Sequence, residues 1–231
     1  MVERAAARAG DDASGDEVRQ LSPDQSRTYW DDRHRTRDEL ASGGNIAFDR
    51  GTNEMLYAVR TARLIEVLGA HTDAEYPLRV LDAGCGKGYF SRRLGTFGHR
   101  VDGIDTSPHA IAECRALGGP GESYHLSALA EWSPPRLYDA VVCIDVLYHL
   151  MDDAEWEASV RHLASLVRLG GVIGLVDHDR DDDVVWHDYQ KTRGRGRYTS
   201  LLESAGFAVT RFVTNDFMHD PSGMHVAVRV G

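Results

Sequence analysis

The feature that most constrains this chain is the stretch from residue 79 to 90, which reads RVLDAGCGKGYF. A short apolar run ends in a carboxylate, and three glycines follow at alternate positions before a helical pattern begins. Glycine adopts backbone angles that other residues avoid, and its missing side chain lets a ligand approach the main chain. The helix that follows directs free N–H groups and a partial positive charge at whatever lies there. The stretch therefore predicts a strand, a glycine turn and a helix that together hold a nucleotide or a nucleoside.

The spacing of the glycines separates two classes of site. A dinucleotide fold has the pattern G-x-G-x-x-G, in which the third glycine allows close packing of helix on strand beside a pyrophosphate. Here Gly84, Gly86 and Gly88 follow the pattern G-x-G-x-G, and Tyr89 stands where the third glycine would be. A glycine-rich turn without any ligand is the alternative interpretation, so the motif needs support from the rest of the chain.

Preceded by Asp82, this pattern resembles the first motif of class I S-adenosylmethionine-dependent methyltransferases. Their methyl donor has no phosphate. It carries a cationic sulfur, an amino-acid tail and an adenosine, which suit a carboxylate at the end of a strand. The resemblance implies that Asp82, Gly84, Gly86 and Gly88 bind S-adenosylmethionine.

Length and composition exclude several other classes of protein. The chain has 231 residues, which fits one large domain, or one domain with a tail, and is enough to bury a core. Its formal net charge of −10 argues against a nucleic-acid binder held by phosphate contacts. There is no apolar run of the roughly 20 residues that a membrane span needs, and no signal peptide at the start. Three scattered cysteines predict buried thiols and a reduced, cytoplasmic setting.

The N-terminal third is predicted to be helical after a tail. Residues 1–21 are polar and aperiodic, and they predict a disordered tail. Ser22 and Pro23 predict the start of a helix that runs to about residue 40. A second helix is expected over residues 52–68. Its apolar face would consist of Leu56, Val59, Leu64, Ile65 and Leu68. We expect residues 22–77 to form a helical cap or lid.

From residue 78 onward, short apolar runs alternate with helical stretches. The runs are 80–83, 101–104, 124–126, 140–144 and 172–176. Such runs predict strands covered on both faces, and their alternation with helices predicts a doubly wound parallel sheet. Two alternating strands, 207–213 and 225–230, close the chain and are expected to pair as an antiparallel hairpin. The predicted fold class is α/β, with a seven-stranded, mostly parallel, Rossmann-like sheet over residues 78–231, and it resembles the methyltransferase fold.

Helices are also expected late in the chain. The first covers residues 153–168, where Trp156, Val160, Leu163 and Val167 fall on one face, and the glycine pair at 170–171 is expected to stop it. A polar stretch follows over residues 177–197, and then a short helix over residues 198–205.

In a doubly wound sheet the ligand lies outside the carboxyl ends of the strands, so the residue that ends each strand is informative. Asp105 ends the second strand about 20 residues beyond the glycine turn, where an acid commonly binds a ribose diol. Its other interpretation is a helix N-cap before Ser107. Ser127 and Ala128 follow the third strand and match the family's Asp-Ala step, which holds the adenine edge. Ser127 replaces the usual acid, so its side-chain contact is in question.

The fourth strand ends at Asp145 and is followed by VLYHL. This segment resembles the fourth motif of the family, which implies that Asp145 lies near the methionine amino group or the methyl acceptor. If the next turn is helical, His149 lies on the same side one turn later. A histidine is a natural base for an acceptor hydroxyl. We predict His149 as the catalytic residue, and a histidine that only shapes the pocket is the alternative.

Two clusters of charged residues lie between residues 177 and 197. Acidic and histidine residues gather at 177–187, but without tight ligand spacing, so we predict a solvated loop and no metal. The basic run from Lys191 to Arg197 is either a mobile surface loop or a clamp for a carboxylate or phosphate of the acceptor. Together with Tyr29, Trp30, Arg33 and His34 of the first helix, it is the expected lid over the site.

The resemblance, over residues 78–230, implies transfer of a methyl group from S-adenosylmethionine to a small-molecule acceptor. Whether that acceptor carries an anionic group is left open. The expected target is a hydroxyl or carboxyl oxygen of a secondary metabolite. Methylation of nitrogen or carbon, a non-catalytic S-adenosylmethionine-binding protein and a nucleotide-dependent oxidoreductase are the alternatives. No nucleic acid or membrane partner is expected, and a homodimer is left open.

Overall fold

The computed structural model describes residues 21–71, 76–218 and 222–231. Residues 1–20 of the expected tail therefore lie outside the described residues. The helices are α1 (Pro23–Thr36), α2 (Glu39–Gly43), α3 (Arg50–His71), α4 (Tyr89–Thr96), α5 (Pro108–Leu117), the 3-10 turn η1 (Leu147–His149), α6 (Asp153–Ser165) and α7 (Arg195–Ser204). The strands are β1 (Arg79–Ala83), β2 (Arg100–Asp105), β3 (Glu122–Leu126), β4 (Tyr138–Cys143), β5 (Val167–His178), β6 (Val184–His187), β7 (Gln190–Thr192), β8 (Phe207–Thr214) and β9 (Ser222–Arg229).

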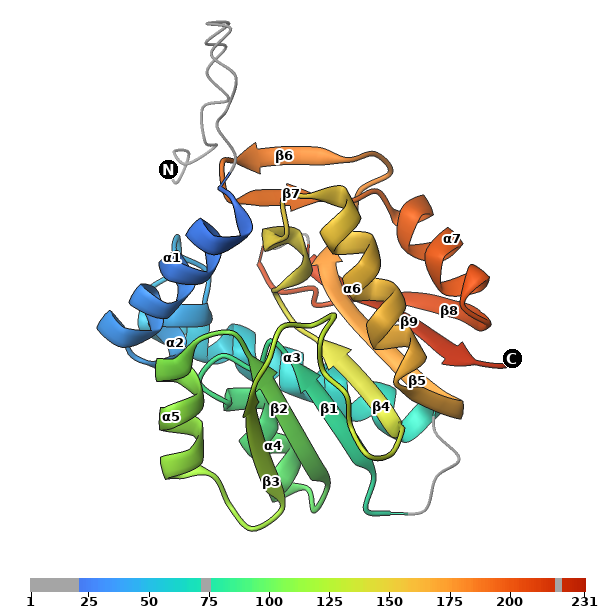
Figure 1. Cartoon of the computed structure of the whole chain (residues 1–231), viewed down its shortest axis with the longest axis horizontal. Helices are drawn as coiled ribbons and strands as arrows, with labels where there is room; N and C mark the ends of the chain where they lie inside the picture. The colour runs from blue at the N-terminus through green and yellow to red at the C-terminus, as the bar shows by residue number, and fades with distance from the viewer. Residues whose placement is uncertain (1–20, 72–75, 219–221) are drawn as a thin grey trace, which may run out of the picture.

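Seven strands form one sheet in the order β3-β2-β1-β4-β5-β9-β8, and β6 and β7 form a separate two-stranded sheet (Figure 1). β1 to β5 pair in parallel, whereas β9 lies between β5 and β8 and is antiparallel to both. The order reverses at β1, so β1 and β4 flank the switch point at which doubly wound sheets bind ligands. The predicted seven-stranded sheet with an antiparallel C-terminal hairpin is confirmed.

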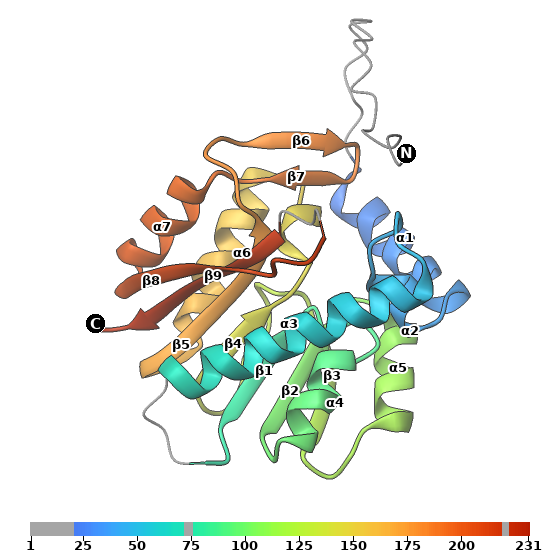
Figure 2. The same ribbon diagram turned by 180° about the vertical axis from the view of Figure 1, so that it is seen from behind.

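Helices cover both faces of the large sheet. α6 and α7 lie on the face seen in Figure 1, and α3 and α4 lie on the face seen in Figure 2. Because successive residues of a strand point to opposite faces, Leu81 and Val141 pack toward α6 and α7, while Val80 and Val142 pack toward α3 and α4. This burial on both faces is the reason that the central strands read as continuous apolar runs in the sequence.

The first helix is shorter than the sequence predicted. Ser22 caps α1 and exchanges hydrogen bonds with Gln25 in a capping box, as expected for a Ser-Pro start. The helix ends at Thr36, however, and the side chain of Asp38 accepts a hydrogen bond from Ala41 N–H to cap the separate helix α2. The single helix expected to residue 40 is therefore wrong in its last turn, because a local cap competes with helix continuation.

The boundary between α6 and β5 also differs from the prediction. The helix ends at Ser165, and β5 begins at Val167, so the glycine pair at 170–171 lies inside the strand. A Cβ atom at Gly171 would lie 2.8 Å from the carbonyl oxygen of Asp139. Gly171 therefore allows close strand approach, and the glycine pair does not stop a helix.

The polar stretch after β5 is more ordered than expected. It contains the hairpin of β6 and β7, and α7 begins at Arg195, earlier than the predicted 198. None of the helices in the described part of the chain is long and apolar enough to cross a membrane. All three cysteines are buried and free, as predicted.

Candidate active site

A cavity of about 590 Å³ lies at the carboxyl ends of β1, β2 and β4. Its floor is the glycine turn, and its walls come from the segments that follow β2, β3 and β4. Helix α1 supplies the opposite wall through Trp30 and His34. Of the predicted site residues, the cavity is lined by Gly84, Gly86, Asp105, Ser127, Ala128, Asp145 and His149. The structure thus brings together seven positions that are spread over more than sixty residues of sequence.

The glycine turn has the backbone geometry that the sequence predicts. Gly84 and Gly86 have φ angles of 78° and 51°, in the left-handed region that L-amino acids with side chains rarely adopt. A Cβ atom on Gly84 would collide with Val146, and one on Gly86 would lie 3.2 Å from the His34 ring. The two glycines therefore let the turn contact both the segment after β4 and helix α1.

Gly88 and Asp82 support the turn from behind and do not line the cavity. Gly88 is the N-cap of α4 at a φ of 81°, where a Cβ atom would lie 2.9 Å from Cys114 Sγ. Asp82 is buried and accepts a hydrogen bond of 2.6 Å from the Ser91 hydroxyl. Burial raises the pKa of Asp82 to about 6, and the nearby charge of Asp105 adds to that rise. Direct contact of these two residues with a ligand stays a prediction.

Asp105 organises the second wall of the cavity. One carboxylate oxygen accepts the Gly86 N–H at 2.9 Å, and the other accepts the Ser107 N–H at 2.8 Å. An ionised carboxylate has about four acceptor positions, so two remain for hydroxyl donors from a ligand. The N-cap of α5 is Ser107, not Asp105. Ser127 and Ala128 lie beside Asp105, because the Ser127 N–H bonds to the Asp105 carbonyl oxygen at 3.0 Å.

Asp145 pairs with an arginine that the sequence analysis missed. The Asp145 backbone is left-handed at a φ of 59°, which is unusual for a residue with a side chain. Arg60 of α3 forms an ion pair with its carboxylate and donates to Ser222 Oγ at 3.0 Å. Arg60 is 6% exposed. It stands midway between Leu56 and Leu64 on the predicted apolar face of its helix, and a charge at that position is a signal of a buried partner.

His149 is held as a neutral imidazole with a defined tautomer. It lies on η1, so the turn after β4 is helical as the prediction required. Its Nδ1 lies 2.9 Å from the Tyr189 carbonyl oxygen, which can only accept, so Nδ1 carries the proton and Nε2 is left with a lone pair. Burial lowers the pKa of His149 to about 4, and the nearby Arg33 and His178 also lower it. At neutral pH Nε2 is therefore unprotonated and carries a lone pair.

Helix α1 closes the cavity and contributes a second histidine. His34 is 6% exposed, and in the described part of the chain its Nδ1 has no hydrogen-bond partner. Burial lowers the pKa of His34, so it is neutral at pH 7. Asp31 fastens the helix to the start of α5 by accepting hydrogen bonds from Ser107 Oγ at 2.6 Å and His109 Nδ1 at 2.8 Å. Sequence reasoning placed His34 in a lid but gave it no role at the donor site.

A second cavity of about 290 Å³ adjoins the first. The two cavities share Trp30, Gly43, Asp145 and His149 in their linings. His149 therefore stands at the junction, where a group held in one cavity meets a group held in the other.

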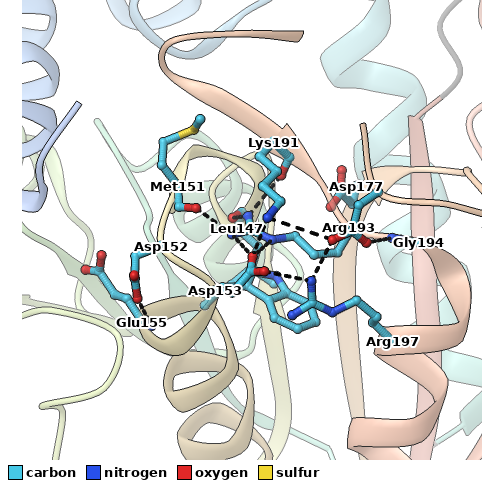
Figure 3. A network of polar contacts seen from close by, with 12 residues as sticks. Leu147, Met151, Asp152, Asp153, Glu155, Asp177, Lys191, Arg193, Gly194 and Arg197 are labelled. Carbon is cyan, nitrogen blue, oxygen red and sulfur yellow. Dashed lines mark hydrogen bonds and ion pairs between the residues drawn. The ribbon is translucent and has the colours of Figure 1, made fainter. Parts of the chain in front are cut away.

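The basic run lies away from both cavities. Figure 3 shows Lys191, Arg193 and Arg197 directed at Asp153, with Nζ of Lys191 at 2.7 Å from its carboxylate. Arg193 is fully buried and also donates to the Met151 carbonyl oxygen at 3.1 Å. Although partial burial raises it, these hydrogen bonds hold the pKa of Asp153 well below its usual range. The interpretation of this run as an acceptor clamp is wrong, because its side chains bind the hairpin to α6 instead.

The acidic cluster is the counterpart of that basic run. Arg195 pairs with Asp179 at 2.6 Å, and Arg197 pairs with Asp183 at 2.6 Å. Asp177 is buried and accepts a hydrogen bond of 2.6 Å from the Tyr198 hydroxyl. Among residues 21–71, 76–218 and 222–231, no group of three or more histidine, cysteine or acidic side chains is arranged to hold a metal ion.

Comparison with known proteins agrees with this geometry. A family model described as a methyltransferase domain matches residues 53–216. A ubiquinone biosynthesis O-methyltransferase of Aeromonas salmonicida (strain A449) is 37% identical over 171 residues, which cover 64% of this chain and 67% of that enzyme. The chain spans only 38% and 39% of the length of two other ubiquinone biosynthesis O-methyltransferases that it matches, from Methylocella silvestris and Sodalis glossinidius.

Solved structures share the fold at low sequence identity. Magnesium protoporphyrin IX methyltransferase from Synechocystis PCC 6803, with bound S-adenosylmethionine, has a TM-score of 0.64 at 23% identity, covering 88% of this chain and 94% of that one. The 1,6-didemethyltoxoflavin-N1-methyltransferase of Burkholderia thailandensis has a TM-score of 0.65 at 17% identity, covering 94% of each chain. The chain therefore belongs to the methyltransferase domain family, with the fold of the class I S-adenosylmethionine-dependent enzymes.

Proposed function

We propose that this chain transfers a methyl group from S-adenosylmethionine to a hydroxyl oxygen of a small-molecule acceptor. One observation carries the proposal: Asp105 and the glycine turn line one part of a single cavity, and His149, with a free lone pair on Nε2, lines the part that meets the second cavity. The first part suits the donor, and the junction suits the transfer.

The residues of the first cavity fit the donor piece by piece. Asp105 has acceptor positions left for the two ribose hydroxyls. The segment of Ser127 and Ala128 would flank the adenine, and the main chain at Gly84 and Gly86 would form the floor beneath the donor. Asp145 and the uncommitted Nδ1 of His34 are polar partners for the amino-acid portion. In this proposal Asp82 and Gly88, which the sequence predicted to contact the donor, support the glycine turn instead.

Catalysis would depend on the relative position of donor and acceptor and on one residue that accepts a proton. Bound S-adenosylmethionine supplies an electrophilic methyl group, whose bond to sulfur breaks with the electron pair remaining on sulfur. His149 Nε2 accepts the hydroxyl proton while the acceptor oxygen bonds to the methyl carbon. The Tyr189 carbonyl oxygen fixes the ring and favours the imidazolium that forms. Helix α1 covers the cavity and excludes water, which favours in-line approach of the two reactants.

An oxygen acceptor is preferred to nitrogen or carbon because a base is in place. The curated relatives named above are O-methyltransferases by name, which supports the same choice. In this proposal residues 22–77 form the lid and residues 78–231 form the catalytic domain. The natural-product setting, the cytoplasmic location and a homodimer stay predictions from the sequence.

Isothermal titration calorimetry of the full chain with S-adenosylhomocysteine and, separately, with NAD tests the donor. We expect micromolar binding of S-adenosylhomocysteine and no heat from NAD. Incubation with methyl-labelled S-adenosylmethionine and a panel of phenols should then release S-adenosylhomocysteine. Tight donor binding without release for any acceptor would favour a non-catalytic binding protein, and NAD binding would favour an oxidoreductase.

A further inference from the structure

Five large aromatic side chains line the second cavity. Tyr29 and Trp30 come from α1, Tyr148 comes from η1, and Trp186 and Tyr189 come from β6 and the turn that follows it. Three segments that are far apart in sequence therefore converge on one small space.

These rings contact one another in a continuous series. Tyr29 stacks with Tyr189 at a centroid distance of 6.0 Å and an interplanar angle of 28°. Tyr148 stacks with His178 at 5.3 Å and 23°, and His178 meets Trp186 edge to face at 5.7 Å. Stacked and edge-to-face pairs at these distances are favourable, and a flat ring that lies against the ring faces lining the cavity gains contacts of the same kind.

The cations of this cavity are already engaged. Arg60 is paired with Asp145, so this pair adds no net charge to the wall. Arg33 donates through Nε to the Ser42 carbonyl oxygen at 2.6 Å and through Nη2 to that of Ala41 at 3.0 Å. Carbonyl oxygens therefore occupy the Nε–Nη2 edge, one of the two edges through which a guanidinium binds a carboxylate with two bonds.

We propose that this second cavity, hereafter the ring chamber, binds a flat, uncharged aromatic acceptor and presents its hydroxyl group to His149. This inference rests on the proposed methyl transfer and names the substrate class of that site. A carboxylate acceptor would meet an Arg60 charge that Asp145 already neutralises and an Arg33 with one edge occupied, and a saturated ring is too thick to gain face-to-face contact. The acceptor specificity is therefore set by α1 and the β6–β7 hairpin, and not by the basic run.

The test measures binding of three matched probes to the full chain saturated with S-adenosylhomocysteine. The probes are 2-naphthol, its saturated analogue 2-decalol and the anion 2-naphthoate, measured by equilibrium dialysis. We expect 2-naphthol to bind at least tenfold more tightly than either of the others. Equal affinity for 2-decalol, tighter binding of 2-naphthoate, or no binding of 2-naphthol would overturn the inference.

A pair of variants places the probe in the ring chamber. Trp186→Leu should weaken 2-naphthol binding about three- to tenfold, whereas Phe97→Leu, at an exposed site at the end of α4, should leave it unchanged. Calorimetry with S-adenosylhomocysteine is run first on every variant, because it separates the two proposals. If the donor does not bind, the proposed function fails. If the donor binds normally but Trp186→Leu and Phe97→Leu give equal 2-naphthol affinity, only the ring chamber assignment fails.

Discussion

The proposed donor side and the proposed acceptor side of this active site are built in different ways. The donor side is formed by main chain and strand ends, with Gly86 N–H and Ser107 N–H both bound to Asp105. The acceptor side is formed by side chains from α1, η1 and the β6–β7 hairpin, which meet only in the folded chain. The comparison teaches that a fixed ligand can be bound by local backbone geometry, whereas a variable ligand is selected by segments that can change independently of the sheet.

The largest effect is expected at the junction of the two sides. His149→Ala should lower kcat about 100- to 1000-fold, because general-base catalysis contributes roughly that much. Donor affinity should change less than twofold, because the ring is not needed to hold the donor. Discontinuous assays of S-adenosylhomocysteine release measure kcat, and calorimetry measures the donor affinity. An unchanged kcat would remove His149 from catalysis, and a large loss of donor affinity would move it to the donor side.

Arg60 connects the two sides through Asp145 and Ser222. Arg60→Ala should lower the free energy of unfolding by about 3 kcal/mol, because it leaves a buried carboxylate without its partner. Arg63→Ala is the matched control on the same helix. Arg63 is half exposed and pairs with exposed Glu66, so its loss should cost below about 0.5 kcal/mol.

Chemical denaturation of both arginine variants measures the difference. Equal destabilisation by the two substitutions would mean that the Arg60–Asp145 pair contributes no more than a surface pair.

On the donor side, Asp105→Ala should weaken S-adenosylhomocysteine binding about 30- to 100-fold. The variant loses the acceptors for a ribose diol and releases two backbone N–H groups, each bond to a charged group being worth roughly 1.5–3 kcal/mol in a folded protein. Acceptor binding in the ring chamber, measured with 2-naphthol at saturating donor product, should change little. A normal donor affinity in the Asp105 variant would refute this map of the site.

A smaller effect is expected where the lid is fastened. Asp31→Asn should weaken donor binding about two- to fivefold, because it removes the charge that binds Ser107 and His109. The adjacent Asp32→Asn is the control, since Asp32 is exposed and its carboxylate pairs with Arg35 of the same helix. Calorimetry of S-adenosylhomocysteine binding to both variants measures this difference. If the two variants behave alike, the contact between α1 and α5 does not support the cavity.

The smallest change is predicted for pH. Because the pKa of His149 is lowered to about 4, its Nε2 stays unprotonated from pH 8 down to pH 6. We therefore expect kcat, measured with a phenol that stays protonated in this range, to vary less than twofold between these values. The acid loss of activity should occur only toward pH 4. An inflection near 6.5 would show that the histidine is not buried as the structure has it.

The sequence predicted the geometry of the glycine turn and the position of Asp105 for a physical reason. Gly84, Gly86 and Asp105 act through backbone geometry within a strand-turn-helix unit, and such units leave a local pattern. Arg60 was missed although it interrupted an apolar stripe, because the pattern alone does not name its partner 85 residues away. Trp186 and Tyr189 were missed because the polar stretch around them shows no strand alternation. The last turn of α6 was mispredicted because Val167 fits the helical period but pairs with Tyr138 in the sheet.

The acceptor assignments were the least predictable. Lys191 and Arg197 look like an anion clamp in a one-dimensional view, since nothing in the spacing reveals that Asp153 lies between them. Ion pairs across distant segments depend on the tertiary fold, and local composition does not encode them.

A crystal structure of the chain with bound S-adenosylhomocysteine tests the central claim most directly. We predict that the adenosine lies against Asp105 and Ala128. The sulfur should lie at the junction beside Asp145 and His149, facing the ring chamber. A sulfur atom that points away from His149, or an adenosine placed in the ring chamber, would contradict it.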